Sequence, residues 1–278
     1  MKKPSWGSWL FLGLVLVFLY LPIVVVVVYS FNANTARIPI DFTGWSTAWY
    51  AKLLSGRGGF GPALVLSLRV AFWSVLLSGI IGTLGAIGMA QRVLVQKQKP
   101  TRLDSLMEAL VSLPIMIPEI ILGLAFMVIF NAMGIRGNDL RLVLAHSTFC
   151  IPYVFLNVKS RLAGMDTALF DAARDLGASP SRVTRDITLP LCSPAIWSGC
   201  FLALAMSLDD FVISFFVYGA GEGTLPIKIY SSVKVGVSPQ VNALCTLIMG
   251  VVFLAVALSR YASSVKNVRE KRRARTAG

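Results

Sequence analysis

Long apolar stretches constrain this chain more than any other feature of its sequence. An α-helix needs roughly 20 apolar residues to cross a hydrocarbon layer of about 30 Å. Stretches of this length lie at residues 9–31, 62–91, 106–133, 140–162, 191–218 and 241–261. Hydrophobic residues make up 56% of the sequence and charged residues 14%. We therefore predict an all-α polytopic membrane protein with about six transmembrane helices.

The connections between these stretches are too short to hold a soluble domain. We predict a single transmembrane domain over residues 1–278, with its core at about 62–262. The first stretch is too long for a cleavable signal peptide, and no small-residue cleavage site follows it, so we expect a retained anchor.

Basic residues collect on one side of the predicted spans. With the N-terminus inside, that side carries Lys2, Lys3, Arg92, Lys97, Lys99, Arg102, Lys159, Arg161, Arg174, Arg182, Arg185 and the tail 260–275. This asymmetry predicts that both termini are cytoplasmic. The tail cluster Lys271, Arg272 and Arg273 is expected to bind anionic lipid. Nucleic-acid binding is the alternative, but lipid attraction already explains such a cluster, so we expect no nucleic-acid partner.

Carboxylates at two places within the predicted spans are candidates for a functional site. Glu119 directly follows Pro118, and Asp209 and Asp210 form a pair. A charge at membrane depth costs at least a few kcal/mol, and such residues usually face a cavity or a partner. We predict that they line a route for a cationic solute, the alternative being a buried ion pair or a cap on a broken helix. Since adjacent helical residues diverge by about 100°, only one of the two aspartates should share a cavity with Glu119.

Prolines interrupt the third predicted span. Pro114 and Pro118 each remove a backbone donor and clash with the preceding turn, so the helix should kink or break there. Irregular backbone at membrane depth persists only inside protein or beside a water-filled cavity. We therefore expect this span to face a pathway.

Small residues recur at four-residue intervals in two spans. They are Ser78, Gly82, Ala86 and Ala90 in the second, and Gly199, Ala203 and Ser207 in the fifth. Such faces let helix backbones approach closely. They predict tight packing within the bundle, or with a second copy or a relative.

The cysteines and the single histidine offer no metal site by their spacing. One histidine cannot complete a ligand set, so we predict a packing or hydrogen-bonding role for His146. The following cysteines are expected to be small buried hydrophobes: Cys150, Cys192, Cys200 and Cys245.

An external connection carries aromatic residues with polar edges. Trp45, Trp49 and Tyr50 lie within residues 44–50. Such rings favour the headgroup level, so we predict a short interfacial helix. An aromatic cage for a cation is the alternative.

A polar insert at about residues 163–190 separates the fourth and fifth spans. Asp166 or Thr167 is suited to begin a short helix that Gly177 ends, and Ser179 with Pro180 is suited to begin a second helix. An apolar stripe is predicted along the first helix, made by Leu169, Phe170, Ala173 and Leu176. An exposed stripe of this kind fits a groove on a partner, or a lipid surface.

The spacing within this insert resembles the coupling loop of ATP-binding-cassette importer permeases. Asp171, Ala172, Ala173 and Gly177, followed by residues 187–190 with the sequence Ile-Thr-Leu-Pro, match the family pattern, with Asp171 in place of its Glu. Other stretches resemble bacterial spermidine/putrescine importer permeases, most closely the C-type: residues 20–32, 44–50, 112–123 and 207–247.

The resemblance implies a type I importer permease in the bacterial inner membrane. It implies a second homologous permease, two cytoplasmic ATPase subunits that hold ATP and Mg²⁺, and an external solute-binding protein. The cargo would be a polyamine, spermidine or putrescine. The residues that would contact the ATPase are Leu169, Phe170, Asp171, Ala172, Ala173, Leu176 and Gly177.

The sequence itself excludes an ATPase site of the usual kind in this chain. It has no phosphate-binding Gly-x-x-x-x-Gly-Lys-Ser/Thr loop and no set of residues for a hydrolase, so we expect neither an enzyme nor a bound cofactor. The alternatives are the same importer class with a different small solute, an ion-gradient-driven secondary transporter, or a membrane scaffold. A scaffold leaves the prolines beside Glu119 unexplained, and a secondary transporter leaves the insert without a purpose.

Overall fold

The computed structural model describes residues 6–35, 41–56, 59–94, 101–219, 221, 223–236 and 238–276. Every regular element in these ranges is a helix. Within these described ranges, five helices are long and apolar enough to span a membrane, and one bent pair makes a sixth candidate. This confirms the prediction of an all-α protein with about six spans. Contacts divide the chain into two compact units, residues 61–228 and residues 1–60 with 229–278.

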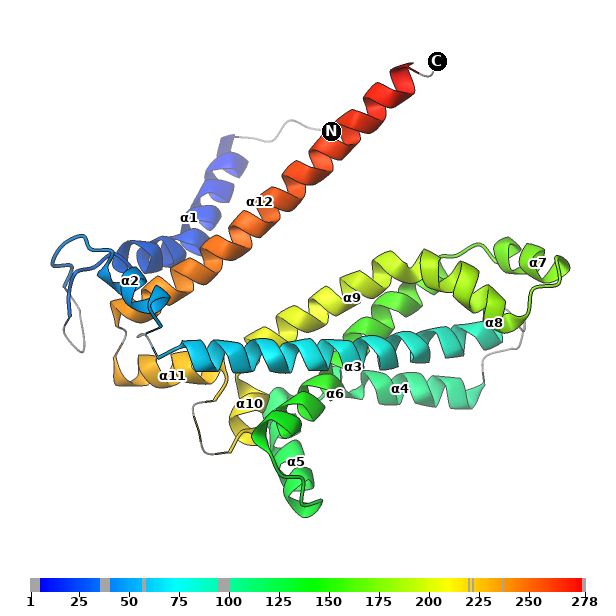
Figure 1. The fold of residues 1–278 in the computed structure, drawn as a ribbon, viewed down its shortest axis with the longest axis horizontal. Coiled ribbons are helices and arrows are strands. Elements are labelled where there is room, and N and C mark those ends of the chain that lie inside the picture. The colour runs from blue at the N-terminus through cyan, green and yellow to red at the C-terminus, as the bar shows by residue number, and fades with distance from the viewer. Residues whose placement is uncertain are drawn as a thin grey trace. The chain divides into compact units, whose positions relative to one another are not determined.

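Three helices form the centre of the unit at residues 61–228. They are α3 (Gly61–Leu94), α6 (Asn138–Ala163) and α9 (Leu189–Asp209), and each packs against the other two (Figure 1). Much of α6 is buried, including Val154, Phe155 and Val158.

The predicted small-residue faces lie between these helices. A Cβ on Gly82 would lie 3.0 Å from the Ile151 carbonyl oxygen, and one on Gly199 would lie 2.8 Å from Val154 Cα. The absence of a side chain at both positions lets α3 and α9 approach α6 closely. The small residues are therefore packing surfaces within the bundle, as predicted.

The third predicted span is broken. Helices α4 (Arg102–Met116) and α5 (Glu119–Ala132) meet at an angle of 105°. The break lies at residues 117–118, so Pro118 ends the helical path while Pro114 remains inside α4. The expected break is confirmed, at one of the two prolines.

The fifth predicted span, residues 191–218, is not one helix. Helix α9 ends at Asp209, Asp210 is extended with φ −63° and ψ 118°, and α10 (Val212–Val217) follows. The aspartates therefore lie at a helix end rather than within a continuous helix. Helix α11 (Leu225–Val235) comes next, and its Leu225 amide donates to Ser67 Oγ of α3.

The insert folds into short helices joined by a tight turn: α7 (Ala168–Asp175), α8 (Pro180–Val183) and the π-helix η1 (Thr184–Thr188). Gly177 has φ +76° and donates to the Arg174 carbonyl, while Ala178 donates to that of Ala173. This hydrogen-bond pattern ends a helix at a left-handed glycine, as predicted. Asp166 Oδ1 accepts from the Ala168 amide, and Ser179 Oγ accepts from the Arg182 amide.

The other unit contains α1 (Trp6–Tyr29), α2 (Ala48–Leu54) and α12 (Pro239–Thr276), with α1 and α2 packed against α12. The interfacial helix begins later than predicted, so Trp45 precedes it while Trp49 and Tyr50 lie within it. The Trp49 ring lies 5.2 Å from Lys52 Nζ, and its Nε1–H donates to the Asn32 carbonyl. Lys2, Lys3, Lys97, Lys99 and the side chains of the basic tail from residue 262 lie outside the described part.

Candidate functional site

A cavity of about 190 Å³ lies where the two broken spans meet. Its lining includes the α4–α5 break, one face of α6 and the α9–α10 break. All three predicted carboxylates contribute to it, and the lining comprises Pro114, Ile115, Ile117, Glu119, Leu122, Phe149, Tyr153, Met206, Asp209, Asp210, Phe211, Val212 and Ile213.

A close contact between α5 and α10 brings the two breaks together. A Cβ on Gly123 would lie 3.0 Å from Phe216 Cδ2 and 3.3 Å from Ile213 Cα. With no side chain at Gly123, the helix that starts after Pro118 packs directly on the helix that starts after Asp210. The carboxylates at the two breaks therefore line one cavity.

Glu119 and Asp209 are the open carboxylates of this cavity. Both side chains are exposed, and neither forms a hydrogen bond or an ion pair within the described residues. Asp209 is the last residue of α9, where the unpaired carbonyls of the final turn also carry partial negative charge. Because the Asp209 carboxylate and these carbonyls are all negative, the end of α9 attracts a cation. Glu119 is the first residue of α5, where the helix N-terminus favours its negative charge.

Asp210 differs from its neighbour because its carboxylate is already engaged. Its Oδ1 accepts from the Ile213 amide at 3.1 Å and its Oδ2 from the Ser214 amide at 2.7 Å. It therefore caps the start of α10. The prediction that only one aspartate shares the cavity with Glu119 was wrong, because Asp210 lies beyond the end of α9 and the 100° helical rotation does not apply.

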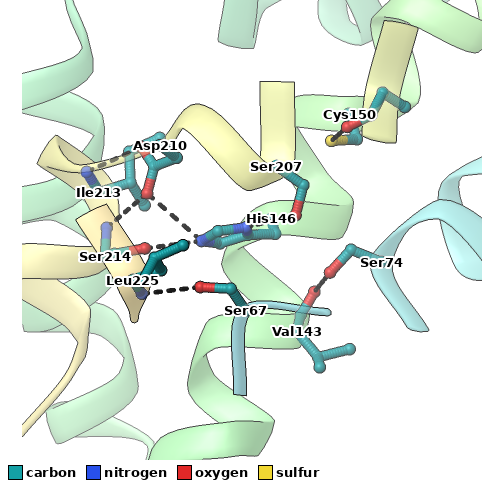
Figure 2. A network of polar contacts seen from close by, with 11 residues as sticks. Ser67, Ser74, Val143, His146, Cys150, Ser207, Asp210, Ile213, Ser214 and Leu225 are labelled. Atoms are coloured by element: carbon teal, nitrogen blue, oxygen red, sulfur yellow. Dashed lines mark hydrogen bonds and ion pairs between the residues drawn. The ribbon is translucent and has the colours of Figure 1, made fainter. Parts of the chain in front are cut away.

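The buried side of Asp210 faces His146, as Figure 2 shows. His146 Nε2 lies 3.3 Å from Asp210 Oδ2 and 3.0 Å from Ser214 Oγ. On the other edge of the ring, Nδ1 lies 2.8 Å from Ser207 Oγ. The hydrogen-bonding role predicted for His146 is confirmed, and the described residues hold no cluster that could bind a metal ion.

The aromatic part of the cavity was missed in the sequence. Phe149 and Tyr153 of α6 line it beside the carboxylates, and Phe211 lies at the second break. A signal was present, because His146, Phe149 and Tyr153 follow the spacing i, i+3, i+7 that places residues on one helix face. Such rings offer a cation both apolar contact and an electron-rich face.

The insert differs from the predicted exposed stripe. Phe170 and Ala173 are buried against Val183 in a small core of their own, with Met165, Ala178 and Ile187 around it. Leu169 and Leu176 remain exposed, at 48% and 89%, with Ala172 between them at helical spacing. The correction follows from the chain's return through α8, which covers one side of α7.

Sequence comparison places this chain in a known family. The family described as binding-protein-dependent transport system inner membrane component matches residues 82–269. The chain is 38% identical to the putrescine transport system permease protein PotI of Escherichia coli strain K12, over 89% of this chain and 88% of that protein. It is also 38% identical to the spermidine/putrescine transport system permease protein PotC of the same strain, over 78% of this chain and 79% of that protein.

A solved structure shares the fold. The crystal structure of a bacterial ABC transporter involved in the import of the acidic polysaccharide alginate matches with a TM-score of 0.66 at 15% identity, covering 94% of this chain and 99% of that chain. The relatives are transport permeases rather than enzymes, in agreement with the sequence analysis. The chain belongs to the family of binding-protein-dependent transport system inner membrane components, with the fold of an ATP-binding-cassette importer permease.

Proposed function

We propose that this chain, acting as one permease domain, carries polyamines such as putrescine and spermidine into the cytoplasm as part of an ATP-driven importer. The observation that supports this most strongly is the cavity in which the open carboxylates Glu119 and Asp209 meet the rings of Phe149 and Tyr153. A polyamine is a chain of methylenes with separated ammonium groups. Carboxylates complement its positive charges, and aromatic rings provide contact surface for its methylenes.

Passage requires binding that is favourable but weak. An ammonium group entering the cavity loses water, which carboxylate oxygens and the carbonyls at the end of α9 replace. The open sides of Glu119 and Asp209 are suited to this, because neither is committed to a partner in the described structure. Release follows when water returns on the cytoplasmic side.

The energy for this cycle comes from other polypeptides. A second homologous permease, two cytoplasmic ATPase subunits with ATP and Mg²⁺, and an external solute-binding protein complete the importer. The exposed residues Leu169, Ala172 and Leu176 are the ones to enter a groove on the ATPase, while Phe170 and Ala173 hold the insert together. Movement of the insert then changes the breaks at Pro118 and Asp210, so that the cavity opens first outward and then inward.

Neutralising the open carboxylates tests this proposal. Glu119→Gln and Asp209→Asn are each expected to lower putrescine uptake and putrescine-stimulated ATP hydrolysis by about tenfold, because each removes a charge-assisted contact with the cargo. The measurement uses the intact complex in proteoliposomes with its binding protein. Asp41→Asn is the matched control, since Asp41 is exposed and does not line the cavity. Uptake like that of the unmodified complex in both variants would exclude the cavity as the cargo route.

A further inference from the structure

A buried polar junction lies behind the cavity and joins three elements. His146 of α6 is 1% exposed, and its two ring nitrogens contact both sides of the α9–α10 break. Nδ1 meets Ser207 in the last turns of α9, while Nε2 meets Ser214 in the first turn of α10 (Figure 2). The imidazole thus connects α6 to both helix ends.

Donor and acceptor accounting shows what this junction does to Asp210. The carboxylate accepts only. The amides of Ile213 and Ser214 donate to it, and His146 Nε2 lies 3.3 Å from its Oδ2. Its side chain is 5% exposed, so water has little access to complete its hydration. A carboxylate satisfied in this way at low exposure is held in place by the protein and has little capacity left for a passing cation.

The position of Asp210 in turn sets that of its neighbours. Asp209 precedes it at the last position of α9, and Phe211 follows it, and both line the cavity. Because the backbone of Asp210 is extended, the directions of both neighbours depend on how the two helix ends are held. His146 contacts both ends, through Ser207 and Ser214.

We propose that His146 is a positioning residue that acts through Asp210 to hold the α9–α10 break in the form that presents Asp209 to the cargo. This rests on the proposed function, in which Asp209 and Glu119 receive ammonium groups. The two adjacent aspartates thus have different tasks: Asp210 fixes the backbone and Asp209 meets the cargo.

Substitutions of the imidazole separate positioning from bulk packing. His146→Leu keeps an apolar side chain but removes both hydrogen-bonding edges, and putrescine uptake is expected to fall about tenfold, as when a buried hydrogen bond to a charged group is lost. His146→Gln restores a donor toward Asp210 and is expected to recover most of the uptake. Equal impairment of the two variants in normally assembled complexes would overturn the proposal.

Double variants test whether His146 acts through Asp210. Asp210→Asn replaces one acceptor oxygen by a donor, so one of the groups around the carboxylate loses its acceptor. Combined with His146→Leu, it is expected to add little further loss, because both changes disable the same junction. Combined with Glu119→Gln, His146→Leu is expected to multiply the losses. Multiplicative losses in both pairs would contradict action through Asp210.

Two further measurements keep the test decisive. If the leucine variant fails to assemble, Ser207→Ala replaces it, since it removes only the Nδ1 contact and is expected to lower uptake about threefold. Unchanged uptake in Ser207→Ala would then overturn the proposal. Asp209→Asn and Glu119→Gln are measured in the same assay. If they impair uptake while His146→Leu does not, the positioning role alone fails; if neither impairs it, the cargo route fails as well.

Discussion

At the scale of single residues, the absence of a side chain is as important as any side chain that is present. Gly82 and Gly199 contact the middle of α6 from two sides, and each lies too close to the α6 backbone for a Cβ to fit without a shift. Gly123 likewise leaves no room for a Cβ where α5 packs against α10, the two helices that begin at the breaks. These positions connect local composition directly to helix packing.

Gly199→Ala is expected to destabilise the folded protein by about 1–3 kcal/mol, the usual cost of overpacking. The added Cβ would lie 2.8 Å from Val154 Cα, which is backbone and cannot rotate away. The thermal denaturation midpoint of the purified complex measures the effect. Gly88→Ala is the control, because a Cβ there meets nothing within 4 Å and alanine favours the helix. An unchanged midpoint for Gly199→Ala would contradict the packing account.

At the scale of elements, the spans were predictable and one of the two breaks was not. The break at Pro118 could be predicted, because proline lacks the backbone N–H that a continuous helix needs. The break at Asp210 depends on His146, which is distant in the chain, and residues 191–218 otherwise read as a continuous apolar helix. For the same reason the burial of Phe170 by Val183 could not be predicted, because the periodicity of α7 does not show which of its sides α8 will cover.

The insert yields a prediction about the contact with the ATPase. Leu176→Asp is expected to release the ATPase from the complex while leaving the insert folded, because Leu176 is 89% exposed and forms no part of the small core. Leu176→Ala removes the apolar contact without adding charge and should weaken the association less. Co-purification with the tagged ATPase measures both variants. Full retention of the ATPase by Leu176→Asp would contradict docking at this residue.

Gly177→Pro is expected to release the ATPase by a different route. Proline fixes φ near −65° and has no N–H, whereas Gly177 has φ +76° and donates to Arg174. The turn between α7 and α8 would then be lost, and with it the shape of the insert. Increased proteolysis of the insert should accompany the loss of co-purification, which distinguishes this variant from Leu176→Asp.

At the scale of the whole molecule, the distribution of basic residues predicts how the chain lies in the membrane. Cysteines placed at Thr47 and Ser181, both exposed, should react from opposite sides. We expect a membrane-impermeant maleimide to label Thr47→Cys in intact spheroplasts and Ser181→Cys only after lysis. The background carries Cys200→Ala and Cys245→Ala, since the other two cysteines are buried. Labelling of Ser181→Cys before lysis would contradict the predicted orientation.

The cavity is lined largely by residues at helix ends, whereas α3 and α9 pack against α6 through their middles. A substitution at Val212 is therefore expected to alter which solutes are accepted while α3, α6 and α9 keep their packing, because Val212 lines the cavity and is not part of their shared core. In the proposed function, the choice of solute then depends on side chains near helix ends, whereas the close approach of the helices depends on glycines in their middles. A change in the accepted solute then requires only single substitutions near the helix ends, without a change in how α3, α6 and α9 pack.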